Sequence, residues 1–152
     1  MQKLNKCGVK RCAALLLAFF LILPSVSVSA VRAAEPRASD YLEDYSAYVS
    51  CADNGVIKVC FDVTGTCELD ELGVLELQLY ESTDNTNWVW VATYASADYP
   101  NLMGHNEAFY SSYVTYTQGI SGRYYRAFVY IRVRDGGGGD SRCFYTSAKL
   151  AP

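Results

Sequence analysis

The sequence predicts an all-β protein, a single antiparallel two-sheet β-sandwich of about seven strands. Three observations support this fold class. Apolar and polar residues alternate with a period of two along several segments, turn-forming residues separate these segments, and no segment has the periodicity of a long helix. Hydrophobic residues make up 51% of the chain and charged residues 19%, which is the composition of a folded protein rather than a disordered one.

The first 30 residues have the three-part pattern of an export signal. Four basic residues precede an apolar run from Ala13 to Leu23, which at 11 residues is too short to span a membrane as a helix. Pro24 ends the run, and Val28-Ser29-Ala30 offers small residues for cleavage. We therefore expect a secreted, extracellular protein with a removed signal peptide at residues 1–30, a spacer at 31–39, a β-sandwich at 40–152 and no membrane span after cleavage.

The remaining 122 residues carry nine basic and 16 acidic side chains, for a net charge of −7. They retain four cysteines, namely Cys51, Cys60, Cys67 and Cys143. An even number of cysteines in an exported domain predicts two disulfide bonds. A chain of this length can bury one hydrophobic core, so the disulfides would reinforce the fold rather than replace a core.

The strands are bounded by turn signals along the chain. Asp53-Asn54-Gly55 predicts a hairpin with a type I′ turn, and Gly65–Gly73, Ala95–Glu107 and the glycine run Gly136–Gly139 are expected to be irregular connections. Asp40–Tyr48 is compatible with a helical turn or with a first strand. The other predicted strands are Ala47–Ala52, Val56–Thr64, Val74–Tyr80, Trp88–Tyr94, Ala108–Thr117, Arg123–Arg134 and Cys143–Ala148.

Within these strands the alternation indicates which side chains face the core. We expect three apolar sets to point inward. They are Ile57, Val59, Phe61 and Val63; Leu75, Leu77 and Leu79; and Tyr125, Ala127, Val129, Ile131 and Val133.

Two segments resemble parts of a fibronectin type III domain. Leu75–Val91 (LELQLYESTDNTNWVWV) resembles the third strand, the hairpin and the following strand, and Arg123–Ala148 (RYYRAFVYIRVRDGGGGDSRCFYTSA) resembles the last two strands. With its leader, the chain also resembles a family of small secreted Firmicutes proteins of unassigned function. Phe61 stands where fibronectin type III domains usually bury a tryptophan, there is no Arg-Gly-Asp motif, and the cysteines are atypical of that class.

This resemblance implies a disulfide pairing. In such sandwiches the second-to-third and sixth-to-seventh strand loops gather at one pole, which favours a bond between Cys67 and Cys143. Cys51 and Cys60 flank the Asn-Gly hairpin and are expected to be diagonal neighbours on one face, within bridging reach.

Chemistry-bearing residues are sparse, so we expect no enzyme, no metal site and no cofactor. The one histidine, His105, lies in a polar loop, and Gly136–Gly139 lacks the lysine and helix of a phosphate-binding loop. Asp135 and Asp140 are too few ligands for calcium. A remote alternative is an acidic-residue glycoside hydrolase, since Glu68, Asp70 and Glu71 cluster in one connection; such a cluster is more often a solvated loop.

Charge is unevenly distributed along the exported part. Residues 31–121 have a net charge of −11 and residues 122–152 a net charge of +4. One interpretation is a basic face for an anionic polymer, and the other is cross-strand pairing of Arg126 and Arg132 with Glu76 and its neighbours. We prefer the pairing, and an acidic secreted chain is not expected to bind nucleic acid.

The remaining feature is an excess of aromatic residues. If Val89 and Val91 face the core, then Trp88, Trp90 and Tyr94 stand together outside as a candidate surface for a cell-wall glycan or an extracellular protein. The alternatives are that such rings cover one another across strands or that the tryptophans are buried. We therefore predict a non-catalytic binding or adhesion-type module, with a secreted self-associating structural protein as the alternative; ligand and oligomeric state are left open.

Overall fold

The computed structural model of the protein describes residues 39–152. The predicted signal peptide and residues 31–38 of the predicted spacer lie outside this range. The last spacer residue, Ser39, belongs with the domain, because its hydroxyl group hydrogen-bonds the Asp140 carboxylate and accepts a hydrogen bond from the backbone N–H of Leu42 at 2.9 Å.

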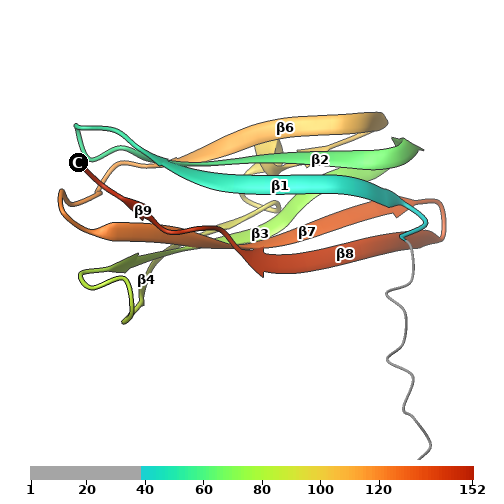
Figure 1. The fold of residues 1–152 in the computed structure, drawn as a ribbon. Helices are drawn as coiled ribbons and strands as arrows, with labels where there is room; N and C mark the ends of the chain where they lie inside the picture. The colour runs from blue at the N-terminus through green and yellow to red at the C-terminus, as the bar shows by residue number, and fades with distance from the viewer. Residues whose placement is uncertain (1–38) are drawn as a thin grey trace, which may run out of the picture. The chain divides into compact units, whose positions relative to one another are not determined.

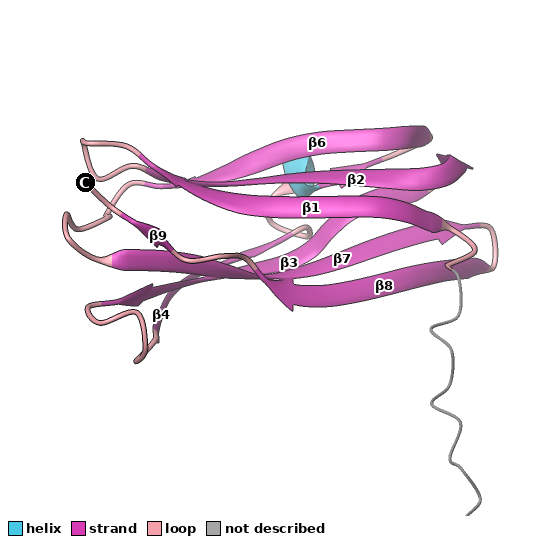
Figure 2. Ribbon diagram, viewed as in Figure 1, coloured by secondary structure: helices cyan, strands magenta, loops and turns pink. Residues whose placement is uncertain are grey.

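Two antiparallel sheets face each other (Figures 1 and 2), which confirms the predicted fold class. The smaller sheet has the strand order β1-β2-β6, and the larger has the order β4-β3-β7-β8 with β5 added to β3 and β9 to β7. Seven of the nine strands contain seven or more residues. The strands are β1 (Leu42–Cys51), β2 (Ile57–Leu69), β3 (Glu71–Ser82), β4 (Val89–Ala95), β5 (Met103–Gly104), β6 (Glu107–Tyr116), β7 (Tyr124–Asp135), β8 (Gly138–Tyr145) and β9 (Lys149–Leu150).

One segment that the sequence left open takes a definite structure, and one predicted irregular connection is wrong in part. Asp40–Tyr48 contributes the start of β1 and not a helical turn. The segment Ala95–Glu107, which was expected to be irregular, contains a 3-10 helix at Pro100–Leu102 and the short strand β5.

The core lies between the two sheets and is built from the inward faces of β2, β3 and β7. The predicted inward sets on β2 and β7 are confirmed, since every member is at most 1% exposed. Burial of each valine, isoleucine or phenylalanine in these sets stabilises the fold by roughly 1.5–3 kcal/mol. These residues are Ile57, Val59, Phe61 and Val63 on β2 and Tyr125, Ala127, Val129, Ile131 and Val133 on β7.

Strand β3 departs from the predicted alternation at one position. Its register against β7 shifts between Val74 and Glu76, so Leu75 sits in a bulge. Val74, Leu77 and Leu79 are fully buried, whereas Leu75, which was predicted to face the core, is only half-buried. A bulge inserts one residue into the alternation and so transfers the inward role from Leu75 to Val74.

The β1–β2 hairpin forms at the predicted place but with a different turn. The N–H of Ala52 donates to the Val56 carbonyl at 2.9 Å, and the N–H of Gly55 donates to the Ala52 carbonyl at 3.2 Å. Gly55 has a φ of +74°, but Asn54 does not have a positive φ, and a type I′ turn needs both. The predicted type I′ turn is therefore wrong; the loop is a three-residue turn that ends in a glycine in the left-handed region.

The predicted connection Gly65–Gly73 is also wrong, because β2 and β3 extend through it and leave Asp70 alone between them. Buried Leu69 and Leu72 anchor the two strand ends. Gly73 permits the extension, since a β-carbon there would lie 2.3 Å from the Leu102 carbonyl oxygen. The acidic side chains that suggested a loop thus lie along strand ends.

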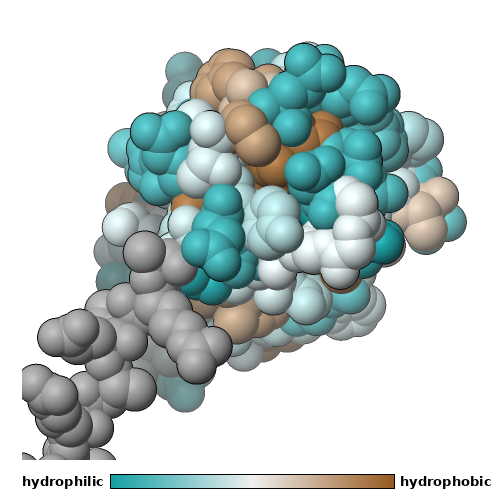
Figure 3. Space-filling model, turned by 90° about the vertical axis from the view of Figure 1, so that its right-hand side faces the viewer, coloured by the Kyte–Doolittle hydropathy of each residue, from teal (hydrophilic) through white to brown (hydrophobic). Residues whose placement is uncertain are grey.

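The β2–β3 and β7–β8 connections meet at one pole, as predicted. The backbone N–H of Gly136 donates to the Asp70 carboxylate at 2.8 Å. Figure 3 looks onto this pole, whose surface is mostly hydrophilic with a small hydrophobic area. At the opposite pole the β1–β2 turn meets the β6–β7 connection, where the N–H of Gly119 donates to the Gly55 carbonyl at 2.9 Å.

The loop formed by the glycine run is shorter than predicted, because β8 begins at Gly138 and includes Gly139. Gly136 takes a φ of +53° in the turn. A β-carbon on Gly138 would lie 2.1 Å from the hydroxyl oxygen of Tyr41, which packs against it. The run therefore serves close packing against the start of β1.

Tyr125 ties the β6–β7 connection to the larger sheet. Its ring is fully buried, and its hydroxyl oxygen accepts a hydrogen bond from the Ile120 N–H at 2.8 Å and donates to the Glu81 carboxylate at 3.1 Å. This arrangement resembles the tyrosine corner, in which a tyrosine at the start of a strand bonds the backbone a few residues upstream. Burial is the main cause that raises the pKa of the Tyr125 hydroxyl, so it is neutral and able to donate.

Replacement of Tyr125 by phenylalanine is expected to lower the free energy of unfolding by about 1–2 kcal/mol, because a part-buried N–H loses its acceptor while the ring is kept. Urea denaturation of the domain measures the change. Tyr124→Phe is the matched control, since the hydroxyl of this neighbouring tyrosine makes no hydrogen bond with residues 39–152. Equal stability of the two variants would show that the corner contributes nothing.

Asp84 organises the turn at residues 84–87, between β3 and β4. Its carboxylate accepts hydrogen bonds from the backbone N–H groups of Thr86 at 2.9 Å and Asn87 at 2.7 Å, and from the side chains of Asn87 and Ser82. The backbone bonds to the ionised form are the main reason that the pKa of Asp84 lies far below its ordinary value.

This turn makes stability depend on acidity. Because the folded-state pKa of Asp84 is lowered, its contribution is fully present above the unfolded value of about 4 and is lost as the pH falls below it. We expect the stability of Asp84→Asn to fall less between pH 4 and pH 2 than that of the wild type. Urea midpoints across this range test the prediction, with the exposed Asp98→Asn as the control; parallel pH curves for wild type and Asp84→Asn would contradict it.

Candidate ligand-binding face

The predicted surface residues Trp88, Trp90 and Tyr94 do not share a face. Trp90 lies opposite Tyr80 on the outer side of the larger sheet and is 57% exposed. Trp88 also lies on this outer side and is half-buried. Tyr94 lies opposite the core residue Leu77 and is 8% exposed, so its predicted place on the surface is wrong.

A bulge in β4 causes this difference. Leu79 pairs with Ala92 and Tyr80 pairs with Trp90, so Val91 is the extra residue. Before the bulge Trp90 keeps its predicted outward side, but Val89, which was expected to face the core, is 62% exposed. Side chains after the bulge change faces. Tyr94 therefore enters the core, where its hydroxyl donates to the Thr115 carbonyl at 3.2 Å.

The outer side of the larger sheet carries a set of aromatic rings around one arginine, which we call the aromatic face. The alternation on β7 points Arg126 and Phe128 outward, and cross-strand pairing adds Tyr80, Trp90 and Tyr145. Trp88 joins them by contact with Arg126. The aromatic face consists of Tyr80, Trp88, Trp90, Arg126, Phe128 and Tyr145.

Arg126 is stacked between two rings of the aromatic face. Its guanidinium carbon lies 4.2 Å from the centre of the Trp88 ring and 4.4 Å from the centre of the Tyr145 ring. Tyr145 in turn contacts Phe128 and Tyr80, with ring centres 5.1 Å and 6.0 Å apart. The rings thus cover one another in part, which is one of the alternatives that the sequence left open.

The cover is incomplete. Trp90 and Tyr145 are 57% and 50% exposed, whereas Trp88, Tyr80 and Phe128 are half-buried. The two exposed rings come from the opposite edge strands β4 and β8 of the larger sheet. The face therefore offers two accessible rings, Trp90 and Tyr145, and a cation that is stacked between Tyr145 and the half-buried Trp88.

Arg126 is the exception among the five arginines of residues 39–152. Arg123 pairs with Glu81, and Arg132 and Arg134 pair with Glu71 at 2.8 and 3.8 Å. Arg142 donates to the Ser141 carbonyl. Arg126 has no ion pair and no hydrogen bond within the described residues.

Arg132 therefore does pair with an acidic side chain across the strands, but its partner is Glu71 and not Glu76; for Arg126 the predicted pairing is wrong. Glu76 lies opposite Tyr130, and Arg126 lies opposite Tyr80, two rows along the sheet. Glu76 instead accepts a hydrogen bond from the Gln78 amide at 2.6 Å. The hydrogen bond from Arg132 is the main reason that the pKa of Glu71 is lowered.

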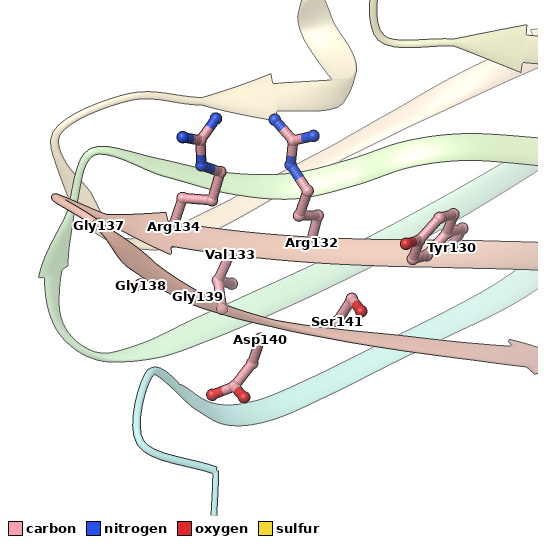
Figure 4. Close-up of a pocket in the computed structure, with 9 residues that line it drawn as sticks. All are labelled: Tyr130, Arg132, Val133, Arg134, Gly137, Gly138, Gly139, Asp140 and Ser141. Atoms are coloured by element: carbon pink, nitrogen blue, oxygen red, sulfur yellow. The ribbon is translucent and has the colours of Figure 1, made fainter.

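A shallow depression of about 430 Å³ adjoins this face at the β7–β8 turn (Figure 4). Arg132 and Arg134 project together from β7, and Asp140 points from β8 toward the start of β1. Asp140 accepts a hydrogen bond from the Tyr41 N–H at 2.9 Å, and Glu71 holds both arginines. The polar groups of the depression thus serve the fold.

The cysteines do not take the predicted pairing. Cys51 lies opposite Ile57 and Cys60 lies opposite Tyr48, three positions apart along β2, so these cysteines point to opposite faces of the sheet and not to one face. Cys67 belongs to the smaller sheet, and Cys143 lies five residues into β8, about 17 Å from the β7–β8 turn. All four are free thiols in the structure.

The outer face of the smaller sheet gives a comparison surface. Cys60 lies between Tyr48 and Tyr113, which are 55% and 52% exposed. A hydrogen bond with Cys60 is the main cause that raises the pKa of Tyr48. Lys58 lies 5.0 Å from the centre of the Tyr113 ring. This face has exposed rings too, but no cation stacked between two of them.

The other chemistry-bearing residues are dispersed. His105 and Glu68 are exposed, Asp70 accepts the Gly136 N–H, and Glu71 is held by arginines. Within residues 39–152 no group of three metal-ligating side chains comes together. In the same range no helix is long and apolar enough to cross a membrane.

Comparisons with known proteins do not extend these observations: no protein-family model, no curated protein and no solved structure matches the chain. The aromatic face is therefore interpreted from its own geometry.

Proposed function

We propose that the protein is a secreted, non-catalytic binding module that recognises a cell-wall glycan or an extracellular protein through the aromatic face. The observation that carries the proposal is the pair of exposed rings, Trp90 and Tyr145, on either side of an arginine without an acidic partner. Exposed rings and an unpaired arginine are the side chains that most often anchor ligands at protein surfaces.

The fibronectin type III resemblance is part of this proposal. The tyrosine corner at Tyr125 and the division of the strands into β1-β2-β6 and β4-β3-β7-β8 support a relationship to immunoglobulin-type sandwiches, whose sheets and loops commonly present binding surfaces. Secretion after cleavage of residues 1–30 remains the expectation from the leader.

The test is capture of the domain, residues 39–152, on purified cell walls and on a glycan array. Trp90→Ala is expected to reduce binding at least tenfold, because it removes the most exposed ring of the face. Tyr48→Ala is the matched control, since it removes an equally exposed ring from the outer face of the other sheet. Equal binding by wild type and Trp90→Ala would reject the aromatic face as the binding surface.

Self-association is a second candidate, favoured by one observation. Strand β6 is an edge strand of ten residues, six of them exposed, and no strand of residues 39–152 pairs with its outer edge. Such edges can pair with a second copy of the chain. Sedimentation velocity distinguishes the candidates: the binding module is expected to sediment as a monomer, and a concentration-dependent dimer disrupted by Thr115→Pro would favour self-association.

A further inference from the structure

We infer that the ligand of the aromatic face is a carboxylate-bearing sugar and that Arg126 binds its carboxylate. This inference rests on the proposed function and names the substrate class of the same face.

The state of the Arg126 guanidinium carries the inference. Rings occupy both of its flat sides, at 4.2 and 4.4 Å, so only the edge with its N–H groups is left for hydrogen bonding. No carboxylate of residues 39–152 lies within 4.0 Å, whereas Arg123, Arg132 and Arg134 each have one. A fixed guanidinium edge is suited to a planar anion that accepts two parallel hydrogen bonds, which is the geometry of a carboxylate.

Stacking also fixes the direction of this edge before a ligand arrives. Trp88 and Tyr145 come from the two edge regions of the sheet, and Tyr145 is braced by Phe128 and Tyr80. An arginine held between rings loses little rotamer freedom when a ligand binds. A larger part of the free energy of each hydrogen bond to the ligand therefore contributes to affinity. Arg126 donates no hydrogen bond to residues 39–152, so the fold does not use its N–H groups, whereas Arg123 and Arg132 donate to Glu81 and Glu71.

The surroundings favour a sugar over a simple anion. The exposed rings of Trp90 and Tyr145 belong to β4 and β8, which are three strand spacings or about 14 Å apart. This footprint is wider than a single ion, and aromatic rings bind the apolar faces of sugar rings by stacking. The face therefore combines stacking surfaces with a single positive charge, which fits an oligosaccharide that contains uronic acid units.

No nearby acidic side chain on β3 repels the carboxylate of such a ligand. The nearest outward carboxylate on β3, Glu76, lies opposite Tyr130, four residues from Arg126 along β7, and is bonded to Gln78. At about 13 Å along the strand it is beyond the screening length in physiological salt. A carboxylate at Arg126 would therefore meet a locally positive site on an acidic domain.

The experiment measures binding of oligogalacturonate and of hyaluronate oligosaccharides to the domain by calorimetry, each beside its carboxyl-reduced, neutral counterpart. Wild type is expected to bind at least one acidic oligosaccharide about tenfold more tightly than its neutral form, and Arg126→Gln is expected to abolish that preference. Lys58→Gln removes one positive charge from the other sheet and is expected to keep the preference.

The outcomes separate this inference from the proposed function. If wild type and Arg126→Gln bind acidic and neutral forms equally and Trp90→Ala weakens both, the aromatic face binds sugars but the carboxylate assignment is wrong. If neither acidic oligosaccharide binds, the inference is overturned, while the cell-wall and array experiment still decides the proposed function. If Lys58→Gln and Arg126→Gln lose the preference for acidic oligosaccharides to the same extent, the preference comes from the overall charge of the domain. That result would also overturn the inference.

Discussion

Replacement of Phe61 by alanine is expected to lower the free energy of unfolding by about 3–5 kcal/mol, a large part of the stability of a domain of this size. Phe61 lies at the middle of β2, the central strand of the smaller sheet, and is fully buried. Its ring contacts Tyr110 with ring centres 6.3 Å apart. The substitution removes apolar contact from both sheets and leaves a cavity that the rigid strands cannot close.

Urea denaturation measures this loss, and Phe109→Ala is the control. Phe109 is on the adjacent strand β6 but 55% exposed, so its removal should change stability by less than about 0.5 kcal/mol. A loss below about 1 kcal/mol for Phe61→Ala would mean that this ring does not occupy the centre of the core.

Replacement of Gly73 by alanine is expected to cost about 2–3 kcal/mol without the removal of any side-chain contact. Gly73 has a φ of +153°, and a β-carbon there would lie 2.3 Å from the Leu102 carbonyl oxygen and 3.0 Å from the Met103 α-carbon. These atoms belong to backbone that is paired with β3, so they cannot move aside as a flexible side chain would.

Gly137→Ala provides the contrast, because open space surrounds a β-carbon at this position and the glycine lies in the β7–β8 turn. Its stability should equal or slightly exceed that of the wild type. Similar stabilities for Gly73→Ala and Gly137→Ala, measured by thermal and urea unfolding, would contradict the close approach of β5 to β3.

The alternation of residues was sufficient to predict the fold class and the inward faces of β2 and β7. It failed where a bulge inserts a residue. The bulge at Val91 moves Tyr94 from the surface into the core, and the bulge at Leu75 exchanges the roles of Leu75 and Val74. A bulge leaves no local signal in such a strand, because its position is set by pairing with a partner far along the chain.

The same limit applies to pairs of side chains. The turn at Asp53–Gly55 has three residues and ends in a glycine bulge, which shifts the register of the hairpin. Cys51 and Cys60 therefore lie on opposite faces of the sheet, where they cannot form the predicted disulfide bond. Arg126 was assigned to Glu76, but register places it against Tyr80 and between two rings. Aromatic excess indicated the candidate face, whereas the unpaired arginine at its centre follows only from the register of four strands.

The proposed function requires the aromatic face to be the binding surface of the protein. Hydroxyl-radical footprinting in the presence of cell-wall fragments tests it directly, because exposed tryptophan and tyrosine rings on both sheets are oxidised in the free domain. We expect the fragments to protect Trp90 and Tyr145 and to leave Tyr48 and Tyr113 open to oxidation. Protection of Tyr48 and Tyr113 with continued oxidation of Trp90 and Tyr145 would contradict it.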